Sequence, residues 1–249
     1  MPGTGTIVGA PGGRPAPVLP PDPTFRRRVL APLLVVPAAF LLGIVVVGVL
    51  TPTAMGQRAV QTIAQVVVSA AILILAVVVW QSLPAHERRA AVALKHSWGG
   101  AIGLGVVVAA GILLFSVSLV AVAWRVDPYV HRHLHDLRDE TTGAAWQTGL
   151  LVFALVVLAP LGEELLFRGL LLRALVRRLR FGPAAIVSGL LFAVAHLDQY
   201  VPAPLWPRTL GLVATGVVLA WLYRWRGYPA SVTAHAAVNA VAAIALIFS

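Results

Sequence analysis

Long apolar runs separated by short polar segments dominate the chain. Five of these runs approach or exceed the roughly 20 residues that a helix needs to cross a bilayer, at 29–51, 59–83, 99–124, 146–167 and 229–248. Two shorter apolar runs lie at 183–197 and 208–223. The pattern predicts an all-α, polytopic transmembrane helix bundle of about seven spans, or eight if 160–181 forms a span of its own.

The distribution of apolar runs and of Pro and Gly divides the chain into three parts. Residues 1–25 are rich in Pro and Gly and have no apolar period, which predicts a disordered cytoplasmic tail. We assign 26–145 to N-terminal transmembrane helices with an outer loop, and 146–249 to a core that carries the chemistry. The first apolar run is of full spanning length and a second follows directly, so a cleavable signal peptide is not expected.

Composition supports a membrane protein. Hydrophobic residues make up 59% of the 249 residues and charged residues only 11%, which is too few to cover a surface facing water. The formal net charge is +10, but the basic residues flank apolar runs, so we expect a bilayer and no nucleic acid as the partner. The chain has no cysteine, which excludes disulfides and thiolate chemistry.

Basic residues predict the orientation. With the N-terminus in the cytoplasm, 13 of the 19 Lys and Arg residues fall in inner segments and 5 in outer segments, and Arg168 remains within a span. The positive-inside rule favours this orientation, in a cell membrane. The Ala, Val and Arg usage further suggests a bacterial source of high genomic GC content.

Charged residues interrupt one apolar run. Glu163, Glu164 and Arg168 lie in a helix that is otherwise apolar, where each ionisable side chain costs about 2.5–3.5 kcal/mol on insertion scales. Glu164 and Arg168 are four residues apart and can pair along one helix face. Glu163 has no such local partner, so we expect it to face another helix.

Two further polar groups follow at helical spacing. Phe192 and His196 share one face, as do His235 and Asn239, and Asn239 is the single asparagine of the chain. Glu163 lies 18 residues before a turn expected near Phe181, and His196 lies 15 after it, so both should lie at a similar depth.

Structural roles remain alternatives for each group taken alone. A buried ion pair or a single core histidine is commonly structural, and polar residues also join membrane helices by hydrogen bonds. Three such groups at compatible depth favour a functional site. His131, His133 and His135 alternate in a loop and could hold a metal on a strand, but a solvated loop is the interpretation we prefer.

These three motifs resemble the CAAX prenyl protease type II family, also called the CPBP or ABI family of intramembrane proteases. The family pattern E-E-x-x-x-R, F-x-x-x-H and H-x-x-x-N is present in order and spacing, over roughly 146–245. The resemblance implies an intramembrane endopeptidase with a CPBP-type core. It implies a peptide or protein substrate, with lipidation left open, and hydrolysis without a covalent intermediate.

The expected chemistry is water activation. Cysteine is absent and no Ser-His-Asp set is evident, so water is the remaining nucleophile. We expect Glu163 as general base, His196 to position the water, and His235 and Asn239 to stabilise the oxyanion. Glu164 and Arg168 would hold their helix in register.

No cofactor is favoured, although zinc held by Glu163, His196 and His235 stays an alternative. The H-E-x-x-H pattern is absent, and asparagine is a poor zinc ligand. Two other functions also stay open: an ion- or proton-coupled transporter, and a non-catalytic membrane scaffold such as a bacteriocin-immunity factor.

Overall fold

The computed structural model describes residues 24–53, 55–127, 144–197 and 206–248. These residues fold almost entirely into helices, which confirms the predicted all-α class for the part described. In chain order the elements are α1 (Phe25–Leu50), α2 (Gln57–Gln81), α3 (Ala85–Ala91), α4 (Trp98–Val126), α6 (Ala145–Phe153), η2 (Ala154–Leu158), α7 (Ala159–Glu164), η3 (Leu165–Leu172), α8 (Arg173–Leu175), α9 (Phe181–Ala195), α10 (Trp206–Arg226) and α11 (Tyr228–Phe248).

Every predicted apolar run lies largely within a helix. Among the residues that the structure describes, four helices are long and apolar enough to cross a membrane: α1, α2, α4 and the continuous run Ala145–Leu175. Helix α9 is apolar but shorter. The chain is therefore a multi-pass membrane protein, whereas the count of seven or eight spans stays a prediction.

Several predictions concern residues outside those described. The tail is described only from Thr24, and α1 already begins at Phe25. His131, His133 and His135 also lie outside the described residues. The predicted disorder, the interpretation of the histidine loop and the three-part division stay predictions.

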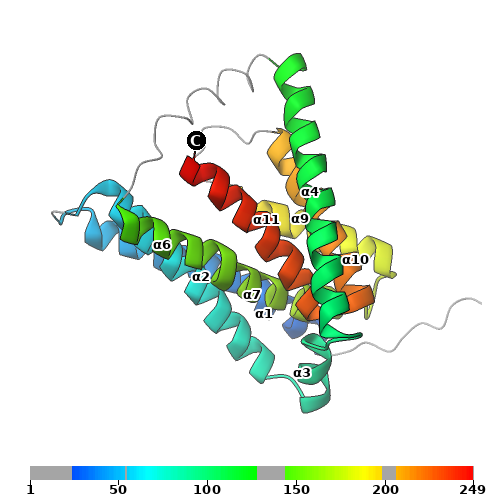
Figure 1. The fold of residues 1–249 in the computed structure, drawn as a ribbon. Coiled ribbons are helices and arrows are strands. Elements are labelled where there is room, and N and C mark those ends of the chain that lie inside the picture. The colour runs from blue at the N-terminus through cyan, green and yellow to red at the C-terminus, as the bar shows by residue number, and fades with distance from the viewer. Residues whose placement is uncertain (1–23, 54, 128–143, 198–205, 249) are drawn as a thin grey trace, which may run out of the picture.

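The helices pack in pairs, and the second half of the run Ala145–Leu175 lies among them, whereas α6 lies at the outside beside α2 (Figure 1). Helix α1 packs on α2, α4 on α11, and α9 on α10. Large apolar side chains remain exposed on the outer helices, for example Leu34 at 65%, Val107 at 66% and Leu114 at 70%. Lipid is the solvent that suits such a surface, because lipid tails need no hydrogen bonds.

The run Ala145–Leu175 becomes the centre of the bundle in its second half. All eight residues of η3 are buried, including Arg168, and they pack into the main apolar cluster with α1, α2 and α9. A helix that is enclosed on every side can hold charged groups only where its neighbours supply partners. The fold thus determines which neighbouring side chains meet the two glutamates.

The turn before α11 fixes where that helix starts. Gly227 has a φ of +89°, and a Cβ there would lie 2.1 Å from the carbonyl oxygen of Ala93. The Tyr228 amide donates to that same oxygen at 3.1 Å, and the Lys95 amide donates to Arg226 O at 3.3 Å. The segment before α4 therefore holds the first turn of α11 in place.

The hairpin between α8 and α9 turns earlier than predicted. The chain reverses over 176–180, and Phe181 is already the first residue of α9. Pro183 stands in the first helical turn, where backbone N–H groups have no partner within the helix, so proline is tolerated there. The Phe181–Gly182–Pro183 sequence therefore starts the helix instead of forming the turn.

Helices α9 and α10 cross at two glycines. A Cβ on Gly216 would lie 2.6 Å from the Cα of Gly189, so the backbones touch directly. Small residues allow this close approach between membrane helices.

We expect Gly216→Ala to destabilise the fold by about 1–3 kcal/mol, because the new methyl group meets backbone that cannot move aside. Thermal unfolding in detergent measures the effect. Gly103→Ala is the matched control, since a Cβ there meets no atom within 4 Å. Equal stability of the two variants would contradict the close crossing.

Candidate functional site

The helix that carries the two glutamates is widened at two places. The π-helical segments η2 and η3 flank α7, which ends at Glu164. In η2 the Ala159 amide donates to Ala154 O, five residues back. The next donor in that register would be Pro160, which has no N–H, so Leu155 O needs a donor from elsewhere.

Asn239 supplies that donor. Its Nδ2 donates to Leu155 O at 2.8 Å, from α11 across to η2. The single asparagine of the chain thus replaces a backbone hydrogen bond that Pro160 removes. This contact is the structural role that the sequence left open, and it uses one of the two amide hydrogens of Asn239.

Two hydroxyl groups contact the same helix in the same manner. Tyr228 Oη donates to Leu161 O at 2.8 Å, and Ser188 Oγ donates to Phe167 O at 3.3 Å. Neither Tyr228 nor Ser188 has a role at the site that the sequence predicts. The position of Tyr228 directly after the turn residue Gly227 is the one feature of the sequence that indicates a structural role. The packing of the helices is needed to identify Leu161 O as its hydrogen-bond acceptor.

Glu164 and Arg168 form the ion pair that their spacing predicted. Arg168 Nη1 lies 3.0 Å from Glu164 Oε1, and both side chains are fully buried. Arg168 Nη2 also donates to Gly216 O at 3.2 Å, which the close glycine crossing brings within reach. The guanidinium carbon lies 4.7 Å from the centre of the Phe192 ring, a cation–π distance.

Glu164 has a second partner that the sequence did not predict. Its Oε1 lies 3.0 Å from His235 Nδ1, so one carboxylate oxygen contacts both Arg168 and α11. Because a carboxylate paired with arginine accepts hydrogen bonds, the ring hydrogen of His235 is on Nδ1. A neutral His235 therefore presents an acceptor at Nε2.

Glu163 faces across helices, as expected. Its Oε2 lies 3.3 Å from His196 Nε2 and 3.9 Å from His235 Nε2. The structure therefore brings Glu163, Glu164, Arg168, His196 and His235 into one connected group. The similar depth predicted for Glu163 and His196 agrees with this distance.

His196 is oriented by the residue one turn earlier. Its Nδ1 lies 2.8 Å from Phe192 O, and a carbonyl only accepts, so Nδ1 carries the hydrogen. The Phe192 ring lies 4.4 Å from the His196 ring and 5.7 Å from the His235 ring, centre to centre. Phe192 thus packs against both imidazoles, and both have Nε2 near Glu163 Oε2.

One carboxylate oxygen of Glu163, Oε2, has no hydrogen-bond donor of good geometry, although two imidazoles lie near it. Among the residues described, none makes a hydrogen bond of good geometry to Glu163 Oε2, although the atom is buried. The His196 side chain is 27% exposed, against 11% for Glu163 and 5% for His235. The group is therefore reached from the His196 side, at the end of α9.

A metal centre formed by Glu163, His196 and His235 is the alternative that the sequence left open. In the described ranges, no group of three or more His, Asp or Glu residues has an arrangement that could hold a metal ion. The two Nε2 atoms converge on one carboxylate oxygen of Glu163 instead. Zinc held by Glu163, His196 and His235 therefore stays a prediction that a metal measurement tests.

Comparison with known proteins finds a family for the part of the chain that contains this group of residues. Residues 145–241 match a family model described as "Type II CAAX prenyl endopeptidase Rce1-like", and this segment contains all three motifs. No curated protein and no solved structure matches the chain. The resemblance predicted from Glu163, His196 and His235 is therefore confirmed: residues 145–241 carry the type II CAAX prenyl endopeptidase, Rce1-like, family pattern.

Proposed function

We propose that this protein is an intramembrane endopeptidase that hydrolyses peptide bonds with a water molecule activated by Glu163 and His196. The observation that carries the proposal is the buried Glu163 Oε2, which lacks a matched donor and lies within 3.9 Å of two imidazole nitrogens. The family match supports a protease, since that family is one of endopeptidases.

The reaction starts with water donating a hydrogen bond to Glu163 Oε2. Glu163 accepts a proton as the water oxygen attacks the substrate carbonyl carbon, and the carbonyl π electrons move to oxygen to form an oxyanion. His196 Nε2 accepts the second hydrogen of the water and so sets its direction. The proton on Glu163 then passes to the leaving amine as the C–N bond breaks.

The oxyanion would be held by α11. His235 Nδ1 already donates to Glu164, so His235 can donate from Nε2 only as an imidazolium, which the Glu164 carboxylate is placed to stabilise. Asn239 keeps one amide hydrogen beyond the one given to Leu155 O. Glu164, which is paired with Arg168, positions His235, and Leu155 O positions Asn239.

Glu163→Gln should lower peptide hydrolysis by at least about 100-fold, because the amide cannot accept the proton. Cleavage by the purified protein measures the change, and thermal unfolding verifies the fold. Ser118→Ala is the control: Ser118 is exposed on α4 and donates to Leu114 O of its own helix at 2.8 Å, so its loss should leave the rate largely unchanged. Undiminished cleavage by Glu163→Gln would remove Glu163 from the mechanism.

Metal removal separates water activation by Glu163 from a zinc-bound water. After exhaustive chelation, with metal content measured, we expect cleavage to persist. The proposed steps use Glu163 and two imidazoles as the proton-handling groups. Activity that disappears on chelation and returns with zinc would establish the metal alternative instead.

The substrate class follows from the position of the site. A catalytic group enclosed by apolar helices suits a peptide segment of a membrane protein or a membrane-bound peptide, and a lipidated tail is one form it could take. A transporter or a scaffold is less favoured, because the polar groups converge on one carboxylate and the family match is to a protease.

We also propose that α1 begins on the cytoplasmic side of the cell membrane, as the positive-inside rule predicts. Because the chain has no cysteine, single cysteines can report the orientation without other changes. Thr53 and Ala85 are exposed and lie beyond opposite ends of α2. A membrane-impermeant maleimide should label Thr53→Cys in intact cells and should label Ala85→Cys only after lysis. The reverse result would invert the topology.

A further inference from the structure

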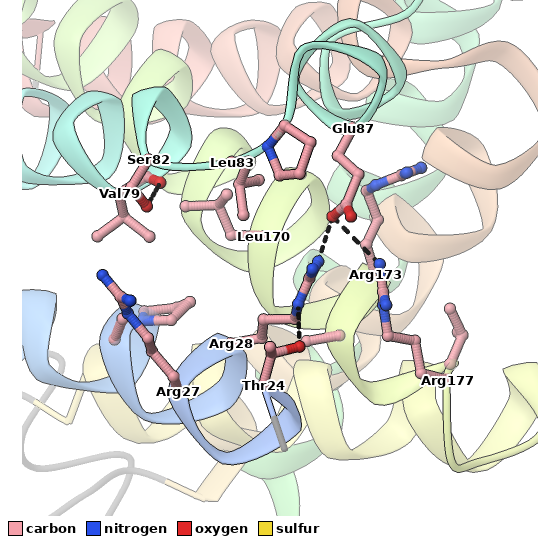
Figure 2. A pocket seen from close by; sticks show the side chains of 16 residues that line it. Thr24, Arg27, Arg28, Val79, Ser82, Leu83, Glu87, Leu170, Arg173 and Arg177 are labelled. Atoms are coloured by element: carbon pink, nitrogen blue, oxygen red, sulfur yellow. Dashed lines mark hydrogen bonds and ion pairs between the residues drawn. The ribbon is translucent and has the colours of Figure 1, made fainter. Parts of the chain in front are cut away.

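A cavity of about 460 Å³ lies at the end of the bundle where α1 begins and α2 ends (Figure 2). The end of the run Ala145–Leu175 and the turn after it form the third side of the cavity. The lining residues there are Gly169, Leu170, Arg173, Ala174, Val176 and Arg177. None of the proposed catalytic residues lines this cavity, so it is separate from the site described above.

The lining is strongly basic. Its charged residues are Arg27, Arg28, Arg173, Arg177 and Glu87. Four guanidinium groups against one carboxylate give a formal charge of +3. A cavity of this charge is suited to an anion.

The one carboxylate is already neutralised. Glu87 pairs with Arg28 and, at 3.1 Å, with Arg177. Burial acts to raise the pKa of Glu87, but the charges and hydrogen bonds of Arg28 and Arg177 outweigh it and hold the pKa below its usual range. Glu87 therefore stays ionised near neutral pH and fixes the position of two of the four arginines.

The other two arginines remain for a ligand. Arg173 donates to the backbone oxygen of Ala90 at 3.4 Å, a long hydrogen bond, and also contacts the Tyr223 hydroxyl, which leaves further N–H groups of its guanidinium for a ligand. Arg27 makes no ion pair within the part of the chain that the structure describes, and in Figure 2 its side chain lies apart from the Glu87 cluster. These two guanidinium groups can donate to a phosphate.

The remaining lining is mostly apolar, with Thr24 and Ser82 as the uncharged polar residues. Pro32, Val79, Leu83 and Leu170 line the cavity together with the charged groups. The adjoining surface of α1 exposes Leu30 at 54% and Leu34 at 65%. A charged end that continues into an apolar, lipid-facing surface matches a molecule with an anionic head and hydrocarbon chains.

We propose that this cavity binds the headgroup phosphate of an anionic phospholipid, with the acyl chains lying along α1. Its position supports the lipid source, because it lies where α1 begins and α2 ends, the level of phospholipid headgroups. Basic residues at this level attract anionic lipids. Leu170 and Arg173 follow Arg168 within two turns of the central helix, so the bound lipid would hold the helix that carries Glu164.

The test measures lipid binding and does not depend on hydrolysis. The purified full chain is first incubated in detergent with phosphatidylglycerol or with phosphatidylcholine of the same acyl chains. Native mass spectrometry then measures how much of each lipid stays bound after the protein is released from the micelle. We expect preferential retention of phosphatidylglycerol. Arg27→Gln should weaken that preference roughly fivefold, the effect of one basic residue at an anionic surface. Arg26→Gln is the matched control, since Arg26 is exposed on the same helical turn and does not line the cavity.

A second variant and a competitor complete the test. Arg173→Gln, with its fold verified by thermal unfolding, should also weaken the preference. Inorganic phosphate in excess should fail to displace the lipid. Equal loss in the Arg26 and Arg27 variants would show diffuse surface attraction and overturn the proposal, as would equal retention of both lipids. Displacement by inorganic phosphate would assign the site to a free anion instead.

Discussion

The Glu164 carboxylate, shared between Arg168 and His235, is the interaction on which the rest of the centre depends. Burying an ion pair is costly, and removing one partner of such a pair typically destabilises a protein by about 3–5 kcal/mol because the other charge is left alone. Here one oxygen contacts groups on two helices at 3.0 Å each. Since His235 receives its orientation from that oxygen, the direction of its Nε2 toward Glu163 follows from the fully buried Glu164–Arg168 pair.

The surroundings of the central helix explain why the polar groups are tolerated. In a bilayer each backbone polar group must find its partner within the protein. The neighbours provide these partners one by one: a hydroxyl from Ser188, a phenol from Tyr228 and an amide from Asn239 reach carbonyls of the widened helix. The central helix is therefore held by side-chain donors as well as by apolar packing.

The sequence was sufficient for the class of fold, the helix positions and the partners within one helix. Spacing alone predicted the Glu164–Arg168 pair, because helical geometry is local. The contact between Glu164 and His235 could not be predicted, since it depends on how α11 is rotated against α7. The hairpin turn was misplaced because a proline in the first turn of a helix resembles a turn signal. Seven or eight spans stay a prediction, because in the described part of the chain length and composition identify four candidate spans and one shorter apolar helix.

Pro160 and Asn239 form a unit that extends from one helix to another. Pro160 has no N–H group and so removes one hydrogen-bond donor from the backbone of the central helix. Asn239 on α11 replaces that donor, because its Nδ2 donates to Leu155 O. The two positions should accordingly be under joint selection. A descendant that exchanges the proline for an ordinary residue regains the lost backbone donor and releases the amide for other uses. The reverse order of change would pass through an intermediate with an unpaired carbonyl inside the bilayer, an evolutionary step that the lipid environment disfavours.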